Sequence, residues 1–241
     1  MAYNYKDNKK NKKFEDRNVK LEISEKFKRL IVDTGRELYK QNLTIGTWGN
    51  ISVLDSETGL VYIKPSGMDY NEINFEDVIV VDKKGKIIEG FRKPSIEMPM
   101  HLSIYNARKD VRAIVHYHPI YSSVLAVTGF SLPGICEDFV QIVGEKVLCA
   151  KYALPGSEEL AENAVTSLGN RNAVFLLNHG TLCVGKDMKD AMKVCYVVEK
   201  TAHIYILSKS IGKCRIIPEE DIKIMQDFAR NAYGKQQNKL R

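Results

Sequence analysis

The segment VRAIVHYHP, residues 111–119, carries the strongest structural and chemical signal in this 241-residue chain. Its apolar residues predict a buried strand. His116 and His118 lie two positions apart, and side chains alternate along a strand, so both imidazoles are expected on one face. Two imidazoles on one face can bind a single zinc ion at about 2.0–2.1 Å without distortion of the backbone.

Two further residues are candidates to complete a metal site. His179 ends a second apolar strand, NAVFLLNHG (172–180), and precedes Gly180, which lets the chain turn because it has no Cβ. Glu97 begins a helix after the segment RKPSI (92–96). Three histidines with a labile carboxylate form a catalytic type of zinc site, because substrate can take the place of the carboxylate. A His-x-His pair alone is equally typical of a buried or interfacial histidine pair.

The two remaining histidines have weaker functional signals. His101 lies one helical turn beyond Glu97 and is expected to flank the site. His203 lies within an amphipathic helical pattern, which indicates a packing or surface role.

Three segments rich in glycine or hydroxyl residues form a second group of candidates. They are IGTWGNIS (45–52), KPSGMDY (64–70) and RKPSIE (92–97), and each lies at a predicted strand end or turn. Such turns expose backbone N–H groups that can hold a phosphate. None of the three matches a Walker loop or a G-x-G-x-x-G fingerprint, so the sequence gives no sign of nucleotide binding. Each glycine could equally serve only the turn.

The remaining pattern mixes strands and helices without regular alternation, which indicates an α/β or α+β fold with helices packed on the faces of a sheet. Ser24 and Asp187 are the expected N-caps of two of the helices. The expected strands are residues 50–55, 60–67, 77–82, 87–91, 111–119, 172–180 and 181–185. The expected helices are residues 24–43, 99–108, 157–169, 188–210 and 218–234.

Composition and charge exclude several classes of protein. The chain is 44% hydrophobic and 27% charged, and no apolar run approaches the length of a membrane span or a secretory signal. Residues 1–20 hold seven basic and three acidic residues, so most of the net charge of +6 lies in this segment. We expect residues 1–20 to form a solvated basic arm and residues 21–241 a single catalytic domain, so nucleic-acid binding is not the expected main function. Five scattered cysteines without Cys-x-x-Cys spacing favour a reducing cytoplasm.

Six segments, in this order, resemble the class II aldolase/adducin family, and together they span roughly residues 24–234. They are GTWGNIS, IKPSGMDY, KPSIEMPMHLSIY, DVRAIVHYHPIYSSVLAV, YALPGSEELAENAV and NAVFLLNHGTLCVG. The resemblance implies a central, mostly antiparallel nine-stranded sheet flanked by helices. It also implies a homotetramer with active sites between subunits.

The same resemblance assigns roles to residues. It implies one zinc ion per subunit at His116, His118 and His179, with Glu97 as a ligand of the resting ion and as the catalytic base. A tyrosine near the C-terminus donates a proton from a neighbouring subunit in this family, and Tyr233 is the matching candidate, with a packing or surface role as the alternative. The positions that match the family's phosphate site are Thr47, Gly49, Asn50, Ser66, Gly67 and Ser95.

The implied reaction is the reversible cleavage of a ketose 1-phosphate, such as L-fuculose 1-phosphate, to dihydroxyacetone phosphate and an aldehyde through a metal-stabilised enediolate. This chemistry needs no Schiff-base lysine, so Lys64 is not required as a nucleophile. Ile96 stands where the aldolases typically have a second serine, which removes one expected phosphate donor. The sequence does not distinguish this reaction from those of aldolases that act on 5-deoxyribulose or methylthioribulose phosphates, or from that of the family's dehydratase.

The sequence leaves two alternatives to a ketose 1-phosphate aldolase. The first is an L-ribulose-5-phosphate 4-epimerase, because IKPSGMDY, including Lys64, resembles the epimerase version of this segment more than the fuculose aldolase version. Asp138 or Glu137 would be the acid/base of that reaction, although loop carboxylates without a catalytic role are commoner. Glu97 argues against it, because the epimerases resemble the aldolases but carry a shorter aspartate there. A non-catalytic adducin-like scaffold is the remote alternative, since such heads are expected to lack the three histidines.

Overall fold

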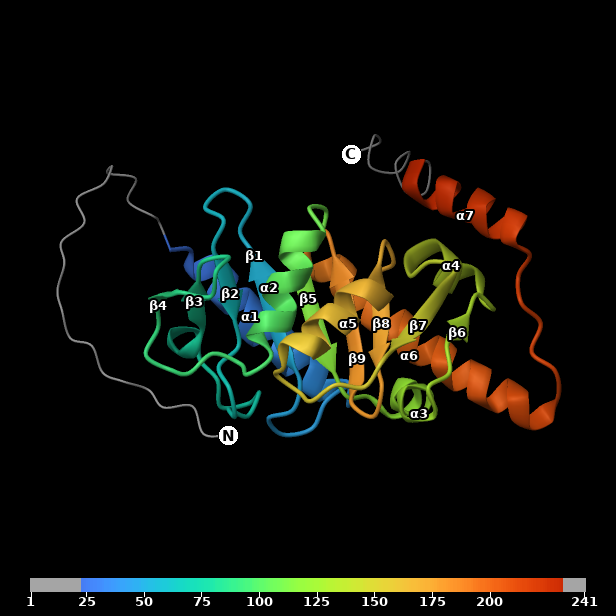
Figure 1. The fold of residues 1–241 in the computed structure, drawn as a ribbon, viewed down its shortest axis with the longest axis horizontal. Coiled ribbons are helices and arrows are strands. Elements are labelled where there is room, and N and C mark those ends of the chain that lie inside the picture. The colour runs from blue at the N-terminus through green and yellow to red at the C-terminus, as the bar shows by residue number, and fades with distance from the viewer. Residues whose placement is uncertain (1–22, 232–241) are drawn as a thin grey trace.

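A nine-stranded sheet forms the centre of the protein in a computed structural model that describes residues 23–231 (Figure 1). The strand order is β4-β3-β2-β1-β5-β9-β8-β7-β6, and every neighbouring pair is antiparallel except β7 and β8. This confirms the expected mostly antiparallel sheet. The strands are β1 (Asn50–Leu54), β2 (Val61–Ile63), β3 (Ile79–Val81), β4 (Ile87–Glu89), β5 (Ala113–Tyr117), β6 (Leu132–Pro133), β7 (Lys146–Ala150), β8 (Ala173–Leu176) and β9 (Gly180–Gly185).

Helices cover both faces of the sheet, and each face has its own apolar core. Successive strand residues point to opposite faces, so Val115 packs in one core and Ile114 in the other. Helices α2 and α5 contribute to the core of Ile114, and α1, α3, α4 and α6 contribute to the core of Val115. The helices are α1 (Glu25–Lys40), α2 (Met98–Ala107), α3 (Ile120–Thr128), α4 (Glu137–Ile142), α5 (Glu158–Leu168), α6 (Met188–Ile211) and α7 (Glu219–Asn231), with one 3-10 turn, Phe75–Asp77.

The strands and helices expected from the sequence are present, with shorter ends in several cases. Asp187 caps α6 as expected, because its side chain accepts a hydrogen bond of 2.7 Å from the Asp190 N–H. Ser24 occupies the N-cap of α1, but its side chain makes no capping bond. Its N–H donates instead to the Tyr62 hydroxyl at 2.8 Å, which ties the start of α1 to β2.

The structure also contains elements that the sequence analysis did not assign, namely α3, α4, β6, β7 and the 3-10 turn. All but the turn lie within residues 120–150, where short apolar runs do not distinguish a helix from a strand. Residues 1–20, expected to form a basic arm, lie outside the described residues. No helix within residues 23–231 is both long enough and apolar enough to cross a membrane.

The topology brings three strand ends to one edge of the sheet. Because β1 and β9 both run antiparallel to β5, the start of β1, the end of β5 and the start of β9 lie side by side. Asn50 is paired with His116, and Thr181 is paired with Tyr117. The N-terminus of α2 reaches the same edge, where the Glu97 side chain accepts a hydrogen bond from that of Asn50.

Candidate metal centre

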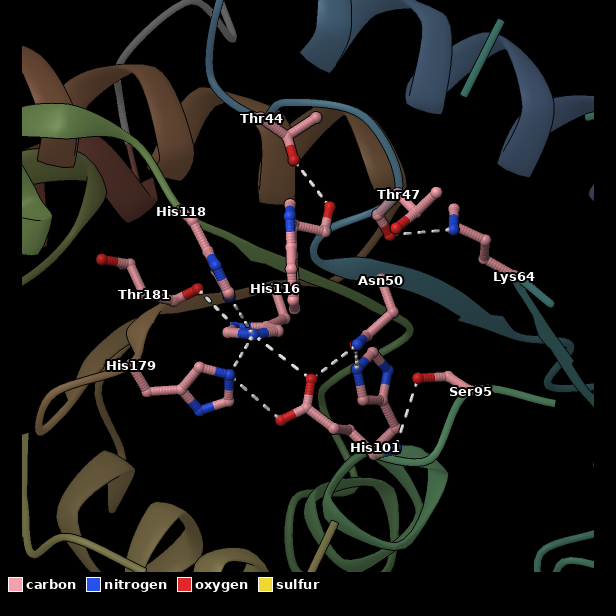
Figure 2. Close-up of polar contacts among 12 residues, drawn as sticks. Thr44, Thr47, Asn50, Lys64, Ser95, His101, His116, His118, His179 and Thr181 are labelled. Atoms are coloured by element: carbon pink, nitrogen blue, oxygen red, sulfur yellow. Dashed lines mark hydrogen bonds and ion pairs between the residues drawn. The ribbon is translucent and has the colours of Figure 1, made fainter. Parts of the chain in front are cut away.

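Three imidazoles converge at this edge (Figure 2). The Nε2 atom of His116 lies 2.9 Å from Nε2 of His118 and 3.2 Å from Nε2 of His179. His116 lies in β5, and His118 directly follows it, as the period-two spacing predicted. His179 is not at the end of a strand as expected: it lies in the tight turn between β8 and β9, because β8 ends at Leu176.

Glycine is required where β9 begins beside these rings. A Cβ on Gly180 would lie 2.6 Å from Cδ2 of His118, 2.8 Å from the Tyr117 carbonyl oxygen and 3.2 Å from Cε1 of His116. Carbon atoms pack at about 3.5–4.0 Å, so the imidazoles can approach β9 only because this side chain is absent. The sequence analysis identified Gly180 as a turn residue, and the structure shows that space is its main contribution.

The tautomer of His116 follows from a hydrogen bond on the far side of its ring. Nδ1 of His116 donates to the Thr181 carbonyl at 3.0 Å, so the proton of the neutral ring is on Nδ1 and Nε2 is free to accept. Burial lowers the pKa of His116 well below its usual value, and burial also lowers the pKa of His118. Burial, followed by the neighbouring His116, lowers the pKa of His179 to about 3.

Glu97 presents a carboxylate to the same point. It is the N-cap residue of α2 and is 5% exposed. Its Oε2 lies 3.3 Å from Nε2 of His116, and its Oε1 lies 3.4 Å from Nε2 of His179. The Asn50 amide donates to Oε2 at 2.8 Å, whereas Oε1 has no hydrogen-bond partner among the described residues.

These donors fit a divalent metal ion. One nitrogen from each histidine lies within 4.8 Å of the others, and imidazole nitrogen and carboxylate oxygen are ordinary zinc ligands. The buried Oε1 of Glu97 is an acceptor that the described part of the protein leaves unused, which is costly unless another group satisfies it. A cation among the four side chains would satisfy it.

The three glycine and hydroxyl segments meet beside this cluster. Pro65 forms an isolated antiparallel bridge with Pro94, and the Ser95 N–H donates to the Lys64 carbonyl at 3.3 Å. The Lys64 ammonium donates to the Thr47 carbonyl at 3.3 Å, which joins the first segment to the other two. The structure therefore gathers the segments that hold the six predicted phosphate-site residues, and their role in binding phosphate stays a prediction.

Individual residues of these segments are placed differently. Ser66 and Gly67 are exposed, whereas Ser95 is buried and its hydroxyl accepts a hydrogen bond of 3.2 Å from the Glu97 N–H. Gly49 has a φ of +78°, and a Cβ there would lie 2.5 Å from the His116 carbonyl oxygen, so glycine is required on both grounds. The Asn50 amide is bonded to Glu97 through Nδ2 and to His101, beside it in Figure 2, through Oδ1.

Lys64 is a feature whose importance the sequence analysis missed. It is 1% exposed and forms no ion pair among residues 23–231; its ammonium contacts the carbonyls of Thr47 and Pro65 and lies over the Tyr70 ring. Burial lowers the pKa of Lys64 to about 8. Buried lysines are rarely left without an acidic partner. One feature of the sequence could have indicated a role for Lys64: it lies in KPSGMDY, a segment predicted to bind phosphate.

The remaining candidates have surface or structural surroundings. Asp138 pairs with Lys200, and Glu137 accepts a hydrogen bond of 2.8 Å from Gln141. His203 stacks on Tyr121 with ring centroids 3.7 Å apart, in agreement with the expected packing role. Tyr233 lies outside the described residues.

The fold and this constellation match known proteins. A family model described as the class II aldolase and adducin N-terminal domain matches residues 29–206. The chain belongs to the class II aldolase and adducin family. The expected fold of a class II aldolase, and the expectation of an enzyme of that type, are thereby confirmed.

Relatives match over nearly the whole chain. The 5-deoxy-D-ribulose 1-phosphate aldolase of Bacillus thuringiensis serovar kurstaki is 39% identical over 216 residues, which cover 89% of this chain and 100% of that protein. A solved structure of an L-fuculose 1-phosphate aldolase has a TM-score of 0.85 at 37% identity, covering 88% of this chain and 99% of the other. The L-ribulose-5-phosphate 4-epimerase UlaF of Salmonella paratyphi B is 29% identical over 224 residues, covering 87% of this class II aldolase and 98% of the epimerase.

Proposed function

We propose that this protein is a zinc-dependent aldolase that reversibly cleaves a ketose 1-phosphate to dihydroxyacetone phosphate and an aldehyde. The observation that carries the proposal is the convergence of three imidazole Nε2 atoms and the Glu97 carboxylate at one point. An adducin-like scaffold would have no use for a buried cluster of neutral imidazoles that faces an unpartnered carboxylate oxygen.

His116, His118 and His179 would hold the metal ion, with Glu97 as a displaceable fourth ligand. A bound divalent cation supplies positive charge that stabilises an enediolate as a carbon–carbon bond breaks. The Thr181 carbonyl fixes the tautomer of His116, so that Nε2 is directed toward the metal position. Zinc suits three imidazoles and a carboxylate, and this ligand set excludes the all-oxygen environment that magnesium and calcium prefer.

Glu97 would take up or deliver the substrate proton. Its Oε2 is held by Asn50, whereas the unpartnered Oε1 is free to bond to a proton on the substrate. The burial of this side chain keeps water from competing for Oε1. We assign to Tyr233 of a neighbouring subunit the proton transfer at the aldehyde oxygen, which makes a homotetramer the expected active form.

The phosphate of the substrate would lie where the three turn segments meet. Thr47, Gly49, Asn50, Ser66, Gly67 and Ser95 would supply its donors. The Lys64 ammonium next to the Thr47 carbonyl adds the positive charge that a phosphate dianion requires. The aldolase relatives support a 1-phosphate, since both 5-deoxy-D-ribulose 1-phosphate and L-fuculose 1-phosphate carry the group there.

A panel of ketose 1-phosphates and 5-phosphates with product analysis tests this proposal. We expect release of dihydroxyacetone phosphate from a 1-phosphate, with about one zinc per chain and loss of both metal and turnover in His118→Ala. His203→Ala is the matched control, because His203 stacks on Tyr121 and is not part of the cluster. Full zinc content and normal turnover in His118→Ala would refute the assigned site.

A 4-epimerase is the second candidate. It is favoured by the match to UlaF and by the resemblance of IKPSGMDY to the epimerase version of this segment. Interconversion of ribulose and xylulose 5-phosphates without release of dihydroxyacetone phosphate would establish it. The candidate acid/base of that reaction is Asp138, which pairs with Lys200 at the surface and would act from a neighbouring subunit.

A further inference from the structure

A chain of four buried hydrogen bonds runs from Tyr105 in α2 to the proposed catalytic base, and its link between His101 and Asn50 is drawn in Figure 2. The Tyr105 hydroxyl lies 2.8 Å from Oγ of Ser52, and that oxygen lies 2.6 Å from Nδ1 of His101. Nε2 of His101 lies 2.5 Å from Oδ1 of Asn50, and the Asn50 amide donates to Glu97 Oε2 at 2.8 Å. The four residues that connect to Glu97 in this way are each at most 4% exposed: Tyr105, Ser52, His101 and Asn50.

The donors and acceptors of this chain can be assigned in one direction only. Oε2 of Glu97 accepts from Asn50 Nδ2, so Oδ1 of Asn50 must face His101. Oδ1 also only accepts, so His101 carries its proton on Nε2. Burial lowers the pKa of His101 to about 3, which keeps the ring neutral and leaves Nδ1 as an acceptor for the Ser52 hydroxyl.

We infer that His101 is a positioning residue for the proposed aldolase reaction, acting through Asn50 on Glu97. Its Nε2–H fixes the orientation of the Asn50 amide, and the amide pins Oε2 of Glu97. The other oxygen, Oε1, is thereby held toward His179, where the proton transfer is proposed to occur. Without the His101 donor, the amide is free to turn its oxygen toward the carboxylate, which would repel Glu97 and misplace Oε1.

Burial explains why this arrangement has a single state. Within residues 23–231, each side-chain polar atom that forms these four hydrogen bonds has no other side-chain or backbone hydrogen-bond partner outside the network, and an unsatisfied buried group costs about 1–3 kcal/mol. Each hydrogen bond therefore fixes which atom donates in the next one. The assignment that begins with Glu97 as acceptor extends in this way to the Tyr105 hydroxyl as donor. From the sequence, His101 was expected only to flank the site.

Two amide substitutions separate positioning from a structural role. In His101→Gln, the amide nitrogen can occupy the position of Nε2 and still donate to Asn50. In His101→Asn, which is one methylene shorter, the amide matches Nδ1 and contacts Ser52 but does not reach Asn50. Both variants place a neutral amide in the same cavity, so each is the matched control of the other.

We expect the zinc-loaded His101→Asn enzyme to lose about 10–100-fold in kcat, the usual effect of losing a partner that orients a ligand, with KM changed by less than about threefold. His101→Gln should stay within about threefold of wild-type kcat. Deuterium exchange into dihydroxyacetone phosphate should follow kcat in both variants, because it reports proton transfer alone. Equal kcat in the two variants, or losses that follow their melting temperatures, would overturn the inference.

A second measurement does not depend on turnover. Neutron diffraction from crystals of the wild-type protein should find deuterium on Nε2 of His101 and none on Nδ1, whatever the substrate proves to be. Deuterium on Nδ1 alone would reverse the chain and exclude positioning through Asn50. The inference rests on the proposed function, but the two can fail separately. If no tested sugar phosphate is cleaved, only the proposed substrate is refuted. If the tautomer of His101 is reversed, only the role of His101 is refuted.

Discussion

Replacing Gly180 by alanine would place a methyl group among the three histidines. The new Cβ would lie 2.6 Å from Cδ2 of His118 and 2.8 Å from the Tyr117 carbonyl oxygen. The Tyr117 backbone cannot withdraw, because Tyr117 is paired with Thr181 in the β5–β9 ladder. The backbone of Gly180 does not have a positive φ, so alanine causes no dihedral strain and the whole effect comes from these contacts.

The magnitude follows from the distances. Relief of the clash requires the His118 ring to move by about 1 Å, since carbon atoms pack at about 3.5–4.0 Å. Metal–ligand distances tolerate only about 0.2 Å, so we expect zinc affinity to fall by at least about tenfold. Overpacking of this kind costs about 1–3 kcal/mol in the free energy of unfolding. For a chain of this length, that lowers the melting temperature by about 2–12 °C.

The assay combines zinc content after dialysis against a chelator, melting temperature and turnover. Gly212→Ala is the matched control, because a Cβ at Gly212 meets nothing within 4 Å and its φ of 165° is extended backbone. We expect this control to match the wild type within about 0.5 kcal/mol. A Gly180→Ala protein with wild-type zinc content and turnover would refute the conclusion that this glycine makes room for the three imidazoles of the proposed metal site.

Three further predictions concern other atoms of the site. In Glu97→Gln, the amide oxygen should keep the bond from Asn50 and the NH2 should replace Oε1, so the protein folds but proton exchange into dihydroxyacetone phosphate is lost; undiminished exchange would exclude Glu97 as the base. Ile96→Ser should lower KM for the phosphorylated substrate without changing the melting temperature, because Ile96 is 64% exposed and its replacement adds a hydroxyl; an unchanged KM would place the phosphate elsewhere. Metal-free wild-type protein should lose stability as pH falls below about 6.5, because the pKa of His101 is about 3 when folded and the unfolded chain binds the proton first. Urea unfolding at pH 6.5 and 5.5 should show this loss to be smaller in His101→Gln by about 1 kcal/mol per pH unit, and identical pH dependence would contradict the assigned burial.

Much of the site could be predicted from residue spacing. The two-residue spacing of His116 and His118 was sufficient to place them together, because strand geometry fixes the relation of residues i and i+2. The length and pattern of α6 and its cap at Asp187 also followed from local sequence. These features depend on interactions within a few residues, which a single sequence expresses directly.

Other features depend on contacts between distant segments. Neither Lys64 nor His101 differs locally from an ordinary lysine or histidine, and their burial arises only when β1, β2 and α2 pack together. The turn that holds His179 follows from where β8 stops pairing with β9, which the apolar run alone did not mark. Tertiary packing also decided which oxygen of Glu97 is held and which is free, because the amide that distinguishes them lies 47 residues away in sequence.

The sequence by itself thus determined the family, the types of the candidate metal ligands and the order of the segments that carry them, since these reside in residue identity and spacing. Only the tertiary structure decided which strand ends meet at one edge of the sheet, how Gly180 admits the imidazoles, and in which direction the buried hydrogen bonds run. The physical reason is that hydrogen-bond direction and close packing are properties of pairs of atoms, and the partners come from parts of the chain that only folding brings together.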